Sequence, residues 1–313
     1  MPDSSDAQLS PLTGIVLKTV SVLAFIVMSS LIKATADTVP AGETVFFRSF
    51  FAIPVIVVWL AMRGQLRVGF QVASPLGHFW RGIAGTAAMA LNFAALGLLP
   101  LPELTAITYA TPLLVVILAS MFLGEEVRVF RLTTVAIGLA GVLIVLYPNL
   151  GDLGDTSDAQ AFGAMMALTG ALCAALAQVF IRKIVATERT SAIVFWFTIT
   201  STVLSLVTIP FGWVLPSLRD TSFLILAGLL GGVGQILLTS AYRFAPASIV
   251  APFDYASMIF ALIIGFVFFS EIPTSMTLIG AAVIIFAGIL IIWRERQLGL
   301  QRDRQRKAQT PQG

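Results

Sequence analysis

Long apolar segments, separated by short polar ones, follow one another along almost the whole chain. Ten of them come close to the roughly 20 residues that cross a bilayer as a helix. Because hydrocarbon offers no partner to backbone N–H and C=O groups, each is expected to be helical. The pattern predicts an all-α membrane protein with ten transmembrane helices, at Leu12–Ile32, Thr44–Met62, Phe79–Leu99, Leu104–Leu123, Leu132–Tyr147, Phe162–Ile181, Ala192–Trp213, Ser222–Tyr242, Ser248–Phe269 and Ser275–Trp293.

Composition agrees with this pattern and excludes several function classes. Apolar residues make up 58% of the 313 residues and charged residues 11%, against about 25% charged in ordinary globular domains. A cytosolic enzyme, a DNA-binding protein and a secreted disulfide scaffold are thereby excluded. Cys173 and His78 are the only residues of their kinds, so intrachain disulfides and multi-histidine metal sites are excluded and no metal or cofactor is expected.

The basic residues predict one orientation in the membrane. With the N-terminus in the cytoplasm, 15 of the 19 lysines and arginines fall in inner loops or in the C-terminal tail 294–313. Three fall outside (Lys33, Arg48 and Arg219), and an acidic outer loop at 148–161 carries no base. This bias predicts that both termini, including the tail 1–11, are cytoplasmic in a bacterial inner membrane. The basic tail is interpreted as a topology and lipid signal, so no nucleic-acid partner is expected.

The first apolar segment also has features of a cleavable signal peptide. Lys18, an apolar run and the small residues Ala34-Thr35-Ala36 follow that pattern. Against cleavage, residues 1–11 carry two aspartates and no base. Cleavage would also leave nine segments, so we expect the segment to be retained.

The two halves of the chain are similar to each other. Residues 82–125 aligned with 228–271 share ten identities in 44 positions, including Tyr109 with Tyr255 and Glu125 with Glu271. We therefore expect two five-helix repeats, 12–147 and 162–293. Since five is odd, the second repeat enters the membrane inverted. Inverted repeats are typical of secondary transporters.

Two segments resemble a known family. Asn92–Glu126 and Gly138–Leu146 look like the EamA-type branch of the drug/metabolite transporter superfamily, although Met258 and Ser270 depart from its motif in the second repeat. The resemblance implies a ten-helix carrier of a small-molecule substrate that works without ATP. The chain looks most similar to bacterial riboflavin, S-adenosylmethionine and amino-acid carriers.

From this we expect riboflavin uptake. The alternatives are an S-adenosylmethionine or an amino-acid or drug carrier, in either direction, and more distantly an intramembrane enzyme. Besides the substrate, the expected partner is the lipid bilayer, and a homodimer stays open.

Charges inside apolar segments are candidate functional groups, because burying them in a membrane is costly. Asp254, just after Pro252, fits a substrate- or proton-binding carboxylate, or else an acid at a helix start that reaches headgroup water. Lys18 fits either such a site or a side chain that extends to the interface. Arg48 fits either a site or a structural pair with Glu43 or headgroups.

Uncharged polar and aromatic residues near the middle of the segments are weaker candidates. They could line a central cavity suited to a flat heteroaromatic solute, or they could form interhelical hydrogen bonds or face lipid. These candidates are Tyr109, Tyr255, Trp196, Asn92, Gln178 and Gln235.

Overall fold

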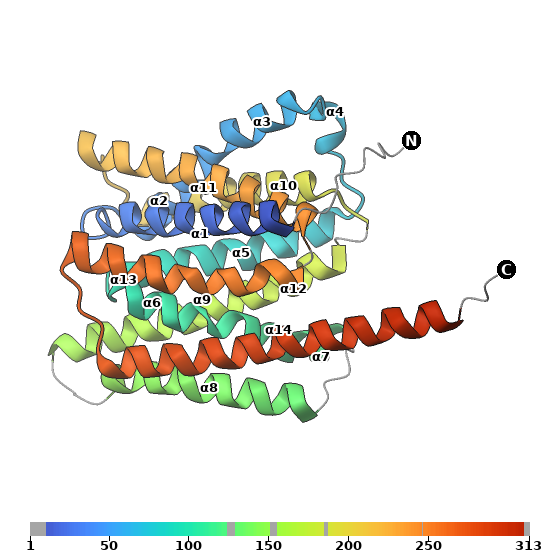
Figure 1. Cartoon of the computed structure of the whole chain (residues 1–313). Coiled ribbons are helices and arrows are strands. Elements are labelled where there is room, and N and C mark those ends of the chain that lie inside the picture. The colour runs from blue at the N-terminus through green and yellow to red at the C-terminus, as the bar shows by residue number, and fades with distance from the viewer. Residues whose placement is uncertain (1–10, 124–128, 151–154, 185–186, 246, 310–313) are drawn as a thin grey trace.

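The computed structural model describes residues 11–123, 129–150, 155–184, 187–245 and 247–309, and this part of the chain is helical with short connections. The helices lie side by side in one bundle (Figure 1). In chain order they are α1 Pro11–Lys33, α2 Ala41–Phe50, α3 Ala52–Met62, α4 Leu66–Gly69, α5 Pro75–Leu96, α6 Leu101–Thr108, α7 Ala110–Leu123, α8 Val129–Leu150, α9 Asp155–Ile184, α10 Thr190–Leu206, α11 Leu218–Phe244, α12 Ala247–Val250, α13 Ala256–Phe269 and α14 Ser275–Gln309, with 3-10 turns η1 Ile209–Phe211 and η2 Ala251–Tyr255.

Three of the predicted segments are each divided into two helical pieces. The breaks fall at Phe51, between α2 and α3, at Tyr109, between α6 and α7, and at η2, before α13. Pro54 and Pro112 lie in the first turn of the helix that follows the break, and Pro252 lies in the turn η2 itself. A proline costs little there, because the first N–H groups of a helix have no partner within it.

Three helices extend beyond the ends of the apolar segments expected from the sequence. The segment 148–161 was expected to be a loop, but residues 148–150 end α8 and residues 155–161 begin α9. The tail was expected from residue 294, yet α14 continues as one helix to Gln309. Helix-forming Arg, Gln and Leu residues dominate this stretch, so nothing in it ends the helix where the apolar segment ends. Residues 1–10 and 151–154 lie outside the described part.

The helices pack in matching pairs. α1 packs along α11, and α5 packs along α9. α8 packs along α14, and α2 along α10. The α8–α14 contact is close: a Cβ placed on Gly280 would lie 2.6 Å from the carbonyl oxygen of Gly141. Leu96, Leu101, Ile107, Leu113 and Ile284 form part of the fully buried core between these helices.

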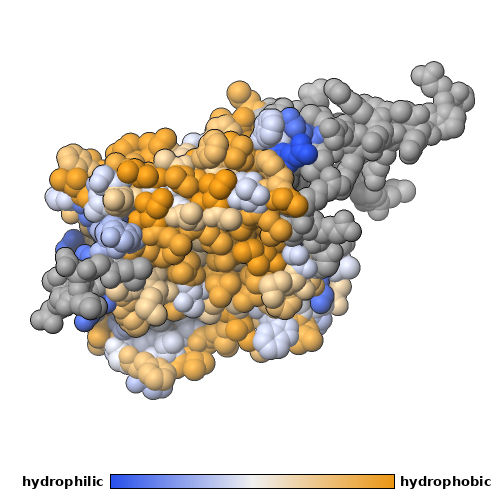
Figure 2. Space-filling view, turned by 90° about the horizontal axis from the view of Figure 1, so that it is seen from below, coloured by the Kyte–Doolittle hydropathy of each residue, from blue (hydrophilic) through white to orange (hydrophobic). Residues whose placement is uncertain are grey.

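The outer surface is apolar over most of its area. Figure 2 shows apolar side chains across the middle of one face and polar ones toward the two ends. Among the described residues, seven helical segments are long and apolar enough to cross a membrane, and Leu132–Pro148 and Ser191–Leu206 are shorter apolar helices. α5, which carries His78 and Arg81, is in neither group. The structure is therefore that of a multi-pass, all-helical membrane protein.

Candidate functional site

Lys18 and Asp254, two of the charges singled out in the sequence, form an ion pair. Lys18 lies in α1 and Asp254 in the turn η2, and their Nζ and Oδ1 atoms are 2.6 Å apart. The Lys18 side chain is 3% exposed, whereas that of Asp254 is 49% exposed. Lys18 thus points into the bundle and does not extend to the interface, and Asp254 stays open on one side.

A second ion pair lies farther along the same helix. Lys33, the last residue of α1, places Nζ 2.9 Å from Oε1 of Glu271, in the loop after α13. Lys33 also donates to the carbonyl oxygens of Leu96 and Leu99, at 3.1 and 2.6 Å. Glu271 Oε2 accepts from the N–H of Leu101 at 2.8 Å. This network joins α1, the α5–α6 connection and the α13–α14 loop at the end of the bundle opposite η2 (Figure 1).

The tyrosines that match in the two repeats are in contact. The rings of Tyr109 and Tyr255 meet edge to face with centroids 5.1 Å apart. The hydroxyl groups of Tyr109 and Ser257 are hydrogen-bonded at 2.6 Å, and the Ser257 hydroxyl lies 2.6 Å from the carbonyl oxygen of Asp254. Gly288 in α14 leaves room for the Tyr255 hydroxyl, which a Cβ there would overlap. The two breaks therefore meet beside Asp254.

Arg48 and Arg81 are both buried inside the bundle. Their exposed fractions are 7% and 8%. Glu43, the expected structural partner of Arg48, accepts instead from the N–H of Val214. Arg81 was counted among the inner-loop charges, but its guanidinium lies over the ring of Phe197 in α10, 3.5 Å from the centroid. Arg81 lies near the start of the predicted segment Phe79–Leu99, and it is the packing of α5 against α10 that buries it.

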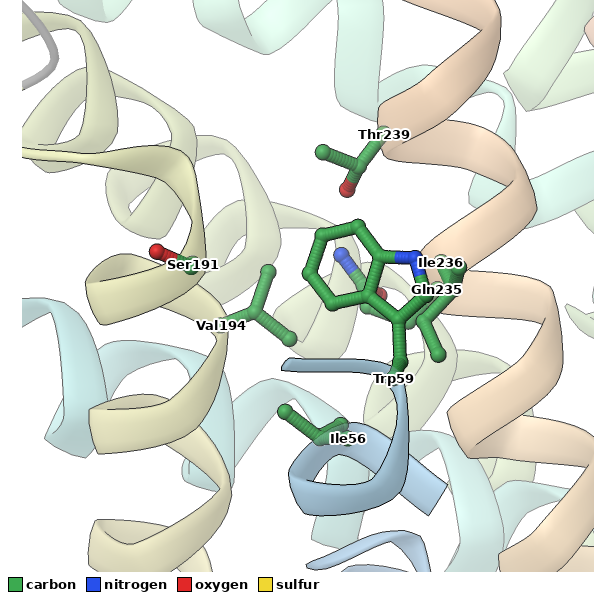
Figure 3. A pocket seen from close by; sticks show the side chains of 7 residues that line it. All are labelled: Ile56, Trp59, Ser191, Val194, Gln235, Ile236 and Thr239. Atoms are coloured by element: carbon green, nitrogen blue, oxygen red, sulfur yellow. The ribbon is translucent and has the colours of Figure 1, made fainter. Parts of the chain in front are cut away.

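The amide and tryptophan candidates are dispersed. Asn92 donates to the carbonyl of Ala88 in its own helix, and Gln178 is exposed on the outside of α9. Gln235 lines a small pocket with Ile56, Trp59, Ser191, Val194, Ile236 and Thr239 (Figure 3). Trp196 donates to the carbonyl of Phe70, at the connection after α4. These four side chains are not gathered in one aromatic cavity.

A polar cluster lies where α5 begins. Glu188, between α9 and α10, accepts from the N–H groups of Ala73 and Ser74 at 2.7 and 2.6 Å. His78 Nε2 lies 3.4 Å from Glu188 Oε1. Burial raises the pKa of Glu188, but these backbone N–H groups and His78 outweigh it and hold the pKa below its usual range. Among the described residues no group of three or more His, Cys, Asp or Glu could hold a metal ion.

The cavities are small. One of about 120 Å³ is lined by residues of α1, α2 and α5, among them Ile32, Thr44 and Phe93. The pocket of Figure 3 holds about 10 Å³. Ligand pockets usually measure roughly 300–1,000 Å³, so neither of these two cavities would hold a metabolite of that size.

Three charged participants were not singled out as site residues from the sequence. Lys33 was counted with the outer charges, Glu271 was used only in the repeat alignment, and Arg81 lies near the start of the predicted segment Phe79–Leu99. One signal was available: Lys33 and Glu271 flank apolar segments at positions where the other repeat carries Arg182 and Glu125. Position in one repeat alone does not show which segments pack together, so the pairs could not be assigned.

Comparisons with known proteins agree with this architecture. The chain is 31% identical over 283 residues to the pseudopaline exporter of Pseudomonas aeruginosa. The aligned region covers 89% of this chain and 95% of that protein. It is 27% identical over 296 residues to the S-adenosylmethionine uptake transporter of Rickettsia felis, covering 94% and 97%. A crystal structure with 18% identity has the same fold, with a TM-score of 0.64 over 90% of this chain and 97% of that one.

A family model also matches the chain twice. The two matches cover residues 12–147 and 161–294, which together are most of the sequence. The family and the named relatives are transporters and not enzymes. The chain belongs to the EamA-like transporter family, within the drug/metabolite transporter superfamily.

Proposed function

We propose that this protein is a secondary transporter of a small organic metabolite in a bacterial inner membrane, built from ten spans in two inverted repeats with both termini cytoplasmic. The observation that carries the proposal is the matched helix pairing. Under the repeat alignment, α1 corresponds to α9 and α11 to α5, so the α1–α11 contact has its counterpart in α9–α5. Such pseudo-symmetry lets one bundle exchange inward- and outward-open forms.

The charge pairs on α1 suit alternating access. Lys18 and Lys33 are 15 residues apart in sequence, which is about 22 Å along a helix. Their acidic partners belong to the turn before α13 and the loop after it. Opening the bundle at one end breaks one pair and keeps the other. The half-exposed Asp254 can then take up a proton or a cationic group of the substrate once Lys18 withdraws.

The substrate proposal changes after the comparisons. Riboflavin gains no support from the relatives, whose names are those of pseudopaline and S-adenosylmethionine carriers. Trp196, Gln178 and Gln235 make separate contacts, so an aromatic cavity for a flat solute has less support. We therefore favour a metabolite with an amino-acid group, of the kind found in S-adenosylmethionine. The direction of transport follows from the gradient that drives it.

Purified protein in liposomes tests this proposal. We expect saturable uptake of radiolabelled S-adenosylmethionine that unlabelled compound suppresses and that protein-free liposomes lack. Riboflavin serves as a second labelled solute. Uptake of riboflavin but not of S-adenosylmethionine would restore the expectation of a riboflavin carrier. If S-adenosylmethionine, riboflavin and pseudopaline are neither taken up nor exchanged, the proposed substrate class is contradicted.

A further inference from the structure

We infer that Arg48 and Arg81 form an anion site inside the bundle that binds the carboxylate group of the transported metabolite, an inference that rests on the proposed function. Arg48 comes from α2 and Arg81 from α5, and each is more than nine-tenths buried. Among the described residues, no carboxylate oxygen lies within 4 Å of either guanidinium, in contrast to the paired Lys18 and Lys33.

Part of each guanidinium has no hydrogen-bond partner. The unsatisfied buried atoms are Nε of Arg48, and Nε and Nη1 of Arg81. The hydroxyl of Ser49, next to Arg48, is also buried without a partner. Buried polar groups normally have a hydrogen-bond partner. A buried N–H group of a charged side chain costs the most free energy when it lacks one. Unpartnered N–H groups on two buried arginines of the packed helices α2 and α5 therefore favour a ligand that supplies acceptors.

The two positive charges also act on each other. Arg48 and Arg81 come from α2 and α5, which pack against each other, so two like charges are buried in adjoining helices, and an arginine cannot release its proton to relieve the repulsion. Phe197 stacks on Arg81 and stabilises its cation, but it supplies no negative charge. An anion between the two side chains would remove both the repulsion and the loss of hydration.

Two glycines leave space next to the guanidinium groups of Arg48 and Arg81. A Cβ on Gly85 would lie 2.8 Å from Nη1 of Arg81, and a Cβ on Gly231 would lie 3.1 Å from Nε of Arg48. Any larger residue at these positions would press on the guanidinium groups. The repeat alignment places Ala227 opposite Arg81 and Phe197 opposite Arg48, so the second copy of the fold forms without either charge.

The chemistry of the site favours a carboxylate. A guanidinium presents paired N–H donors that match the two oxygens of a carboxylate. The hydroxyl groups of Thr86 and Ser201, hydrogen-bonded to each other at 2.8 Å, lie one residue after Gly85 and one turn after Phe197. The cavity of about 120 Å³ includes Thr44, one helical turn before Arg48. The cavity therefore lies on the same helices as the two arginines, α2 and α5.

Two related ligands isolate the carboxylate. S-adenosylmethionine and its decarboxylated form differ by this one group, and calorimetric titration of the full chain in detergent measures both. We expect S-adenosylmethionine to bind at least about tenfold tighter, as loss of a charge-assisted hydrogen-bonded pair predicts. Arg48→Gln and Arg81→Gln should each remove that preference. Arg219→Gln, an exposed arginine over Phe223, is the matched control and should keep it.

Lysine variants and simple anions cover the remaining outcomes. If a glutamine variant fails to fold, Arg48→Lys or Arg81→Lys retains the charge and should bind with intermediate affinity. Thermal unfolding with pyruvate, benzoate or inorganic phosphate, against chloride, detects the site without the true substrate. If pyruvate or benzoate raises the unfolding temperature of the wild type but not of the glutamine variants, the site is supported. This holds even if liposomes fail to transport S-adenosylmethionine. Stabilisation by phosphate alone, or equal effects on wild type and both glutamine variants, overturns it even if transport is observed.

Discussion

Lys33 and Glu271 join the end of α1 to the α13–α14 loop through an ion pair of 2.9 Å whose side chains are only 13% and 14% exposed. Each partner also has backbone contacts, to Leu96 and Leu99 on one side and Leu101 on the other. The pair therefore fixes three connections at once. It holds these segments together at this end of the bundle, while the Asp254 side chain at the other end is half exposed.

Glu271→Gln should destabilise this closed end. The amide keeps one hydrogen bond but leaves the Lys33 charge largely buried without its counter-charge, which we expect to cost about 2 kcal/mol of unfolding free energy. Unfolding in detergent by a denaturing surfactant measures the change. In the double variant with Lys33→Met, the combined loss should be smaller than the sum of the two single losses. Additive losses would contradict coupling between the two residues.

Asp254→Asn should impair transport more than folding. Asparagine keeps the shape of the side chain but can neither carry the charge that pairs with Lys18 nor exchange a proton. We expect normal amounts of protein in the membrane, loss of concentrative uptake into liposomes, and retention of solute exchange. Since the Asp254 side chain is 49% exposed, the stability loss should stay near 1 kcal/mol.

Lys18 supplies the matched comparison. Lys18→Met removes the buried partner and leaves Asp254 facing the opening, so this variant should retain proton-dependent uptake with an altered pH profile. Full uptake with an unchanged pH profile in Asp254→Asn would remove Asp254 from the mechanism and leave Lys18 as the next ionisable candidate.

The contact between Glu188 and the start of α5 should depend on pH in a defined direction. The pKa of Glu188 is held below its usual range, so its contribution to stability is present above that range and is lost as the pH falls through the lowered pKa. Glu188→Gln should cost about 1–2 kcal/mol near pH 7. The difference from wild type should shrink below about pH 4. Unfolding midpoints across this pH range measure it, and a difference independent of pH would contradict the prediction.

Much of the fold could be predicted from properties of single segments, namely their apolar length and their prolines. The all-helical membrane architecture followed from the apolar segments, and the helix interruptions lie at or next to Pro54, Pro112 and Pro252. The segment 148–161 was expected as a loop, and polar residues there extend α8 to Leu150 and begin α9 at Asp155. Local composition does not show how far a helix continues beyond the apolar region.

The candidate site was predicted in part. Asp254 and Lys18 were each singled out by the cost of a charge in an apolar segment, but their pairing depends on α1 packing against η2. Arg81 was missed because it lies near a predicted helix end, where a charge is unremarkable. Only the packing of α5 against α10 shows that it is buried on Phe197. Pairing between distant segments is thus the information that apolar patterning lacks.

The orientation proposed for the protein can be tested with two exposed positions at opposite ends of the bundle. Gln65 lies between α3 and α4, and Ile272 lies between α13 and α14. In a Cys173→Ala background, cysteine at residue 65 should react with an impermeant thiol reagent only after the cytoplasmic face is opened. Cysteine at residue 272 should react in intact cells. Reaction of both from the same face would contradict the proposed arrangement of the spans.

Gly280→Ala should weaken the contact between α8 and α14. A Cβ at residue 280 would lie 2.6 Å from the carbonyl oxygen of Gly141 and 2.5 Å from a methyl group of Val145, and the backbone oxygen cannot move without displacing α8. Overpacking of this kind costs about 1–3 kcal/mol.

Ala282→Leu, at an exposed position of the same helix, adds more volume but faces the surroundings, so it should leave the unfolding midpoint within error of wild type. Because α8 and α14 are the last helices of the two proposed repeats, a destabilised Gly280→Ala protein that keeps substrate exchange would place this contact in the static part of the carrier. Equal midpoints for Gly280→Ala and wild type would mean that the two helices do not approach this closely in the membrane.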